Sequence, residues 1–90
     1  IEILEAEDEL IITHKLGLNL RASSELVKVA SQFKSHVVVE KNGSSTDGKS
    51  LIGLISLAVV YGTKLRVKTE GEDAREALGA IRELVGRRIG

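Results

Sequence analysis

The sequence contains no cysteine, methionine, tryptophan or proline, and its two aromatic residues are Phe33 and Tyr61. Without cysteine it has no disulfide and no thiolate metal site, and this composition fits a reducing compartment such as the cytoplasm. With so few aromatic rings, the stacking platforms of proteins that bind single-stranded nucleic acid are not expected. Because even position 1 is not methionine, we expect that the first residue of the natural protein is not part of this sequence.

An excess of charge of one sign is also missing. Lysine and arginine number 13 and aspartate and glutamate number 13, so the basic face that nucleic acid usually selects is not expected. The longest apolar stretch, around Leu51–Val60, is interrupted by Gly53 and Ser56 and falls short of the roughly 20 residues that span a bilayer. Residues 1–8 are rich in acidic side chains, unlike a signal peptide, and we interpret them as a solvated lead to a single domain covering residues 1–90.

Local patterns predict four strands and three helices. Short β-branched or alternating runs indicate strands at Glu9–His14, His36–Glu40, Ser44–Asp47 and Thr63–Thr69. Helices are expected after Asn19 and from Ser50 to about Ala58, where each begins at a side chain that can accept from free amides, and from Asp73. The order β-α-β-β-α-β-α predicts an α+β fold, a two-layer sandwich with the helices on one face of the sheet. A ferredoxin-like fold shares most of this order, so the pattern alone leaves both folds open.

Apolar side chains at helical spacing indicate which helix faces are buried. The first helix has the stripe Leu26, Val29, Ala30 and Phe33, and the last has Ala74, Ala77, Leu78, Ile81, Leu84 and Val85. In the short helix, we expect Leu54, Leu57 and Ala58 in the core, whereas a second apolar face consists of Leu51, Ile52 and Ile55. So small a domain buries a second face with difficulty, and an exposed apolar patch usually marks a docking surface. The alternative is that a neighbouring loop covers this patch.

Two segments carry a resemblance to a known family. His14-Lys-Leu-Gly-Leu-Asn-Leu-Arg-Ala22 is similar to the active-site motif Gly-Leu-His-x-Arg-Pro of the HPr family of the bacterial phosphotransferase system. Gly48-Lys-Ser-Leu-Ile-Gly-Leu-Ile-Ser-Leu-Ala58 resembles that family's regulatory-serine segment, and the resemblance extends over about Leu10 to Val85. It implies an HPr-like open-faced sandwich with a four-stranded antiparallel sheet and three helices. It also implies a phosphocarrier-like protein of the cytoplasm that is not an enzyme and needs no cofactor.

The first segment departs from the family motif at two positions. Asn19 stands where the family has its phosphorylated histidine, and Ala22 stands where it usually has proline. Arg21 matches the arginine that assists the phosphate. In lacking the histidine and keeping the serine, the chain resembles the Crh-type HPr-like proteins.

The change to asparagine removes the chemistry of the motif position. HPr-type transfer needs an imidazole nitrogen that attacks a phosphoryl donor, and a carboxamide nitrogen has its lone pair delocalised into the carbonyl. We therefore interpret Asn19 as a helix cap, with the alternative that the amides beside it bind a free anion or a partner's phosphate. His14 and His36 are interpreted as ordinary residues at strand ends, and neither has a neighbour at a spacing typical of metal ligands.

Ser50 is the better candidate for a functional residue. Taken alone, a serine after Gly-Lys is a helix cap, but the resemblance implies a regulatory phosphorylation site recognised by a kinase. A phosphoserine at a helix start meets free amides and a favourable dipole, and Lys49 and Arg21 would add charge partners if they lie close. The resemblance also implies that Lys49, Leu51, Ile52 and Ile55 dock protein partners.

Three hypotheses about function follow. The first is a regulatory HPr-like protein that is phosphorylated at Ser50 and whose partners are phosphotransferase-system proteins, HPr kinase/phosphorylase and transcriptional regulators of carbon use. The second is a conventional phosphocarrier, which requires a nucleophile that Asn19 does not supply. The third is a binding module that competes with true HPr and needs the apolar patch but not Ser50.

Overall fold

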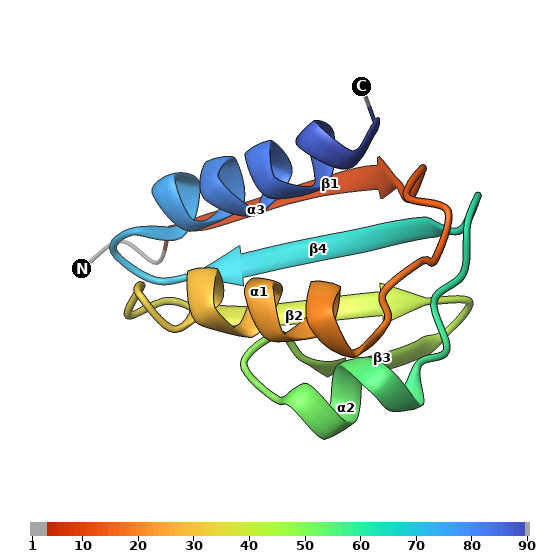
Figure 1. The fold of residues 1–90 in the computed structure, drawn as a ribbon. Helices are drawn as coiled ribbons and strands as arrows, with labels where there is room; N and C mark the ends of the chain where they lie inside the picture. The colour runs from red at the N-terminus through yellow and green to blue at the C-terminus, as the bar shows by residue number, and fades with distance from the viewer. Residues whose placement is uncertain (1–3, 90) are drawn as a thin grey trace.

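The computed structural model describes residues 4–89, and within this range the chain forms four strands and three helices in the predicted order (Figure 1). Side chains are described for residues 4–85. The strands are β1 (Glu5–Ile11), β2 (His36–Lys41), β3 (Ser44–Asp47) and β4 (Lys64–Glu70). The helices are α1 (Leu20–Ala30), α2 (Leu51–Ser56) and α3 (Ala74–Ile89).

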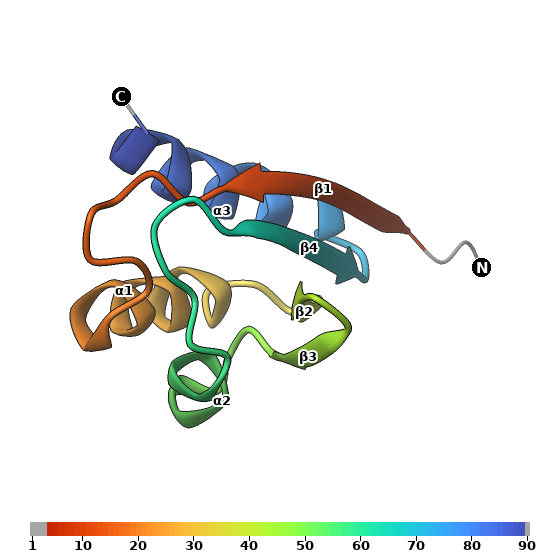
Figure 2. The same cartoon turned by 90° about the vertical axis from the view of Figure 1, so that its right-hand side faces the viewer.

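The strands form one antiparallel sheet in the order β1-β4-β2-β3. All three helices lie on one side of this sheet, in front of it in Figure 1 and toward the left of the strands in Figure 2. The other face of the sheet carries mostly charged and polar side chains, and none of the described helices covers it. The predicted two-layer, open-faced α+β sandwich is therefore confirmed.

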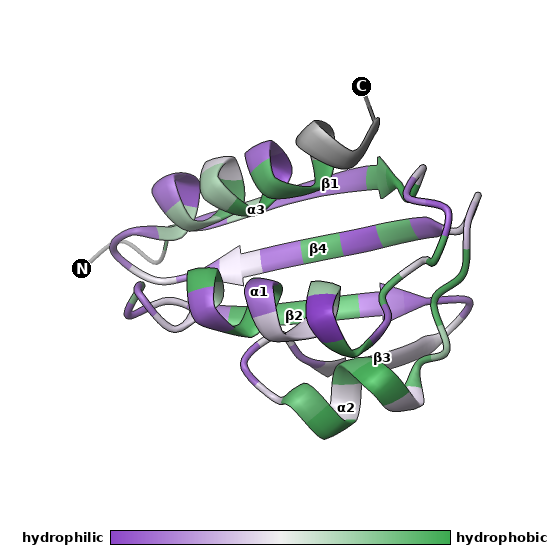
Figure 3. Cartoon of the chain, viewed as in Figure 1, coloured by the Kyte–Doolittle hydropathy of each residue, from purple (hydrophilic) through white to green (hydrophobic). Residues whose placement is uncertain are grey.

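The core lies between the sheet and the helices. In β4 the side chains alternate, so that Leu65, Val67 and Thr69 are buried while the charged residues between them face the solvent (Figure 3). The helices contribute most of the stripes that the sequence predicts, and the fully buried members include Leu26, Leu54 and Ile81. Phe33, predicted in the stripe of the first helix, lies beyond the end of α1 at Ala30 and is half-buried. Burial of this apolar surface, at about 25 cal/mol per Å², is what holds so short a chain in one fold.

The acidic N-terminal segment was wrongly predicted to be a lead as far as residue 8. The first strand runs from Glu5 to Ile11 and not from Glu9 to His14, so residues 5–8 belong to the sheet, while residues 1–3 lie outside the described residues. Residues 5–8 are held in the strand by backbone pairing with β4, and arginines from β4 and α3 offset part of their negative charge. Arg66 of β4 lies 2.8 Å from the carboxylate of Glu7, and Arg82 of α3 lies 2.8 Å from that of Asp8. These carboxylates accept hydrogen bonds from arginine, which lowers the pKa of both.

Helix α2 is shorter than predicted, and its C-terminal end is held by a distant residue. Ala58, expected in the core, is exposed and follows the helix with a positive φ of 53°. The ammonium group of Lys41 donates to the carbonyl oxygens of Leu57 and Ala58 at 2.9 and 2.8 Å. A cation at this end of a helix is favoured by the helix dipole and by the unpaired carbonyls. The helix therefore ends where a lysine from β2 caps it.

A carboxylate from the start of α3 anchors the loop that leads into β2. Asp73 accepts hydrogen bonds from the amides of Lys34 and Ser35, both at 2.9 Å, and from the Ser35 hydroxyl. The Ser35 hydroxyl and these amides hold the pKa of Asp73 below its ordinary value. The ionised carboxylate therefore joins two segments that are far apart in the sequence.

This anchor predicts an acid-dependent loss of stability. A carboxyl group whose pKa is lower in the folded chain contributes stability that is complete above its unfolded pKa, about 3.9, and that is lost as pH falls through the folded value. The difference in unfolding free energy between the wild type and Asp73→Asn is expected to be constant from about pH 5 to 7 and to shrink below about pH 4. Urea denaturation across this pH range measures it. A difference that stays constant down to pH 2 would contradict this account of Asp73.

No helix within residues 4–89 is both long enough and apolar enough to cross a membrane. The side chains of residues 86–89 at the end of α3 are not among those described.

Candidate functional site

Asn19 caps α1 as predicted. Its side-chain oxygen Oδ1 accepts a hydrogen bond from the amide of Ala22 at 3.0 Å, while its backbone is extended with φ −72° and ψ −176°. Such a cap satisfies one of the amides that have no acceptor within the helix and contributes about 1 kcal/mol.

Asn19 and Ala22, the two positions that depart from the family motif, are the acceptor and the donor of this hydrogen bond. Proline has no N–H, so a proline at position 22 could not donate to the side chain of residue 19. The alanine at position 22 supplies the amide that the asparagine cap uses. Asn19 and Ala22 are therefore matched to each other as a structural pair.

His14 lies beside Asn19 and not at the end of a strand, so our interpretation of it as a strand-end residue was wrong. Strand β1 ends at Ile11, and His14 belongs to the loop that leads to α1. An open depression before α1 is lined by His14, Leu16, Asn19, Arg21 and Ala22. His36 is the first residue of β2 and lies on the open face of the sheet.

The loop that carries His14 is held against the segment between α2 and β4. The amide of Leu18 donates to the carbonyl of Val59 at 2.9 Å, and the amide of Ile12 donates to that of Thr63 at 3.0 Å. Gly17, which lies in the sequence between Ile12 and Leu18, has φ +63°, a conformation that favours glycine. The position of His14 therefore depends on contacts with residues more than forty positions later.

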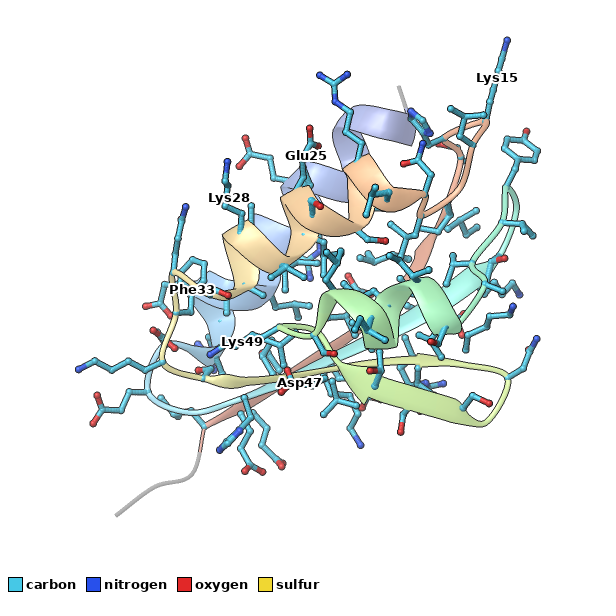
Figure 4. All side chains as sticks on the ribbon, turned by 60° about the horizontal axis from the view of Figure 1, so that its bottom comes forward. Lys15, Glu25, Lys28, Phe33, Asp47 and Lys49 are labelled. Carbon is cyan, nitrogen blue, oxygen red and sulfur yellow. The ribbon has the colours of Figure 1, made fainter. Side chains whose placement is uncertain are left out.

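Arg21 is available to a ligand at this depression. Its side chain is 89% exposed, and its ion pair with Glu25, one helical turn further along α1, is long at 4.0 Å. Exposed pairs of this kind contribute little to stability, so an anion of higher charge can replace the carboxylate. Lys15 extends into the solvent from the same loop (Figure 4).

Ser50 caps α2, as predicted, and is half-buried. Its hydroxyl oxygen accepts a hydrogen bond from the amide of Gly53 at 3.1 Å. The ammonium group of the neighbouring Lys49 donates to the carbonyl oxygen of Phe33 at 2.8 Å (Figure 4). Lys49 is therefore engaged with the segment between α1 and β2, and a phosphate on Ser50 would have to compete with the Phe33 carbonyl for its charge.

The apolar face of α2 is largely uncovered. Ile52 is 78% exposed and Ile55 is 44% exposed, whereas Leu51 is half-buried. The sequence did not indicate that other large apolar side chains are exposed near the ends of these helices, namely Leu16, Leu20, Val60 and Tyr61. Their exposure follows from the loop paths before α1 and after α2, which no local periodicity describes.

Comparisons with known proteins identify the family. Residues 6–87 match the family model described as the PTS HPr component phosphorylation site. The chain is 47% identical over 74 residues to a phosphocarrier protein HPr of Neisseria meningitidis, covering 82% of this chain and 83% of that protein. It is 36% identical over 75 residues to the HPr-like protein Crh of Halalkalibacterium halodurans, covering 83% of this chain and 89% of that protein.

The solved structures agree with this result. The crystal structure of HPr-C-His from Thermoanaerobacter tengcongensis superposes with a TM-score of 0.91 at 34% identity, covering 94% of this chain and 96% of that one. This match decides for the HPr fold over the ferredoxin-like alternative. HPr proteins carry phosphoryl groups and are not enzymes. The chain therefore belongs to the HPr family, the phosphocarrier proteins of the phosphotransferase system.

Proposed function

We propose that this protein accepts and hands on phosphoryl groups in the phosphotransferase system of the cytoplasm. The relative from Neisseria, named a phosphocarrier protein, has a higher identity to this chain than the relative named Crh, and the family model is described by its phosphorylation site. These comparisons favour the conventional carrier over the regulatory hypothesis. The lack of a nucleophilic nitrogen at Asn19 is the one observation that argues against this carrier function.

The observation that carries this proposal is the depression before α1. Its lining includes an exposed arginine, Arg21, in the first turn of α1, where the first amides have no acceptor within the helix. Arginine and such amides favour a phosphoryl group. Asn19 supplies no nucleophile, so a carrier function requires an acceptor nitrogen elsewhere in the depression.

Phosphorylation of Ser50 is a second candidate function. It is supported by the position of Ser50 at the start of α2, next to the exposed side chains of Ile52 and Ile55. A phosphate there would add about two negative charges at the edge of an apolar docking surface and so change which partner binds. In this hypothesis the partners are HPr kinase/phosphorylase and a transcriptional regulator.

Intact mass after two incubations tests both functions. The protein is incubated with the general phosphotransferase enzyme and phosphoenolpyruvate, and separately with HPr kinase and ATP. An acid-labile phosphate from phosphoenolpyruvate is expected for the carrier. A phosphate gained only from the kinase and absent in Ser50→Ala would instead establish the regulatory function. A protein that gains phosphate in neither incubation would fit the competing binding module.

The apolar face of α2 gives a separate prediction about docking. Ile52→Asp is expected to weaken binding of the general phosphotransferase enzyme about 10- to 100-fold, because it places a charge at the centre of a desolvated contact. Val38→Asp is the matched control, since Val38 is an exposed apolar residue on the open face of the sheet. Isothermal titration calorimetry of both variants measures the effect. Equal losses in the two variants would show that α2 is not the docking surface.

A further inference from the structure

The depression before α1 contains one side chain able to attack phosphorus. Among the residues that line it, Leu16 and Ala22 are apolar, and the nitrogens of Asn19 and Arg21 are delocalised and carry no available lone pair, whereas His14 has an imidazole. We infer that His14 is the phosphoacceptor of this protein and takes its phosphoryl group from a phosphohistidine on a partner protein. This inference rests on the proposed carrier function and names its nucleophile.

One hydrogen bond selects the attacking nitrogen. The amide of Leu16 donates to Nδ1 of His14 at 3.3 Å. In the neutral ring this contact assigns the lone pair to Nδ1 and the proton to Nε2. The contact is at the long end of the range for hydrogen bonds, so it constrains the ring weakly. A second bond, from the Gly17 amide to the His14 carbonyl at 2.9 Å, closes the turn that holds the ring beside α1.

The transfer balances without another reagent. The N–P bond of the partner's phosphohistidine breaks, and its ring leaves with the bonding electron pair. A bond forms between phosphorus and Nδ1 of His14, while the proton on Nε2 stays in place. The amide of Leu16, which now faces Nδ1, is then free to donate to a phosphoryl oxygen. Arg21 exchanges its long contact with Glu25 for a charge-assisted bond to the same group.

The other histidine lies in an environment that disfavours phosphate. His36 shares a depression on the open face of the sheet with four glutamates, namely Glu5, Glu7, Glu40 and Glu70, and with Lys68. A phosphoryl group there would meet several negative charges, whereas the depression of His14 is lined by Arg21, and the adjoining pocket adds a single carboxylate, Glu25, which pairs with Arg21. His36 is therefore an internal control that shares the chemistry of His14 but lacks its surroundings.

A small chemical donor tests the nucleophile without any partner protein. The ¹⁵N-labelled wild type is incubated with phosphoramidate, and two-dimensional NMR of the imidazole nitrogens identifies which nitrogen is phosphorylated and how fast. We expect reaction at Nδ1 of His14 about tenfold faster than at His36, the effect of one charge-assisted hydrogen bond in the transition state. Arg21→Ala is expected to remove most of this advantage. Equal rates at the two histidines, or faster reaction at His36, would overturn the inference.

Phosphoenolpyruvate with the general phosphotransferase enzyme tests the same site with its natural class of donor. We expect one phosphate on the wild type and on His36→Gln, and none on His14→Gln, whose folding is checked by its melting temperature. If His14→Gln is phosphorylated as fast as the wild type, the carrier function stands and His14 is not its acceptor. In a third outcome, neither the wild type nor any variant gains phosphate from the enzyme, while His14 still reacts preferentially with phosphoramidate. This outcome would overturn the carrier function and the partner protein as donor, but His14 would remain the preferred nucleophile.

Discussion

Replacing Gly17 by alanine is expected to destabilise the fold by about 3 kcal/mol or more and to disorganise the loop that carries His14. A Cβ atom at this position would lie 2.3 Å from the carbonyl oxygen of Val59 and 2.8 Å from the Cα atom of Val60. Both are backbone atoms and cannot rotate away. The same carbonyl accepts the hydrogen bond from the amide of Leu18, so relieving the clash breaks a contact that positions the start of α1.

Gly62→Ala measures the cost of placing alanine in a left-handed backbone conformation without a steric clash. Gly62 has φ +85°, also a left-handed value, but a Cβ atom there would have no neighbour within 4 Å. It is expected to cost only about 1 kcal/mol, the conformational part of the effect. Urea denaturation of both variants measures the difference. If Gly17→Ala were no more destabilising than Gly62→Ala, the close approach of the loop to residues 59 and 60 would not be a feature of the protein in solution.

Asn19→His is expected to create a second phosphoacceptor in the same depression. The imidazole restores a nitrogen with an available lone pair at the position where the family motif has histidine. In the background of His14→Gln, which we expect to be inactive as an acceptor, this change is expected to restore phosphorylation by phosphoenolpyruvate and the general phosphotransferase enzyme. The loss of the asparagine cap costs about 1 kcal/mol, which a melting curve detects.

The number of phosphates on each variant completes this test. Intact mass is expected to show one phosphate on the double variant Asn19→His/His14→Gln, as on the wild type. Asn19→Asp is the control, because aspartate keeps the helix cap but supplies no imidazole. A double variant that stays unphosphorylated would mean that position 19 does not face the donor, against the resemblance of the motif.

Short-range signals predicted most of the fold. The caps Asn19 and Ser50 begin α1 and α2 as expected, because capping depends on a side chain and an amide three residues apart. The prediction was wrong where the relevant contact was distant. β1 is a strand from Glu5 because it pairs along its whole length with the distant β4, and the carbonyls that follow α2 are capped by Lys41 from β2.

In the candidate site, too, local features were predicted correctly and distant contacts were not. Its motif residues, Asn19 and Arg21, could be found from the sequence because a helix start and a short motif are local features. His14 was assigned to the end of a strand, since nothing in the spacing from 14 to 19 shows that the chain turns back at Gly17. Lys49, expected to support Ser50, instead donates to the carbonyl of Phe33, sixteen positions earlier.

The sequence by itself determined the order of elements, the helix caps, the buried face of each long helix and the family motif with its asparagine, because periodicity and capping act over a few residues. Only the tertiary structure decided that His14, Asn19 and Arg21 share one depression and that His36 lies among glutamates on the opposite face. The physical reason is that loop paths are set by hydrogen bonds such as that from Leu18 to Val59, between segments that approach each other only when the sheet has formed.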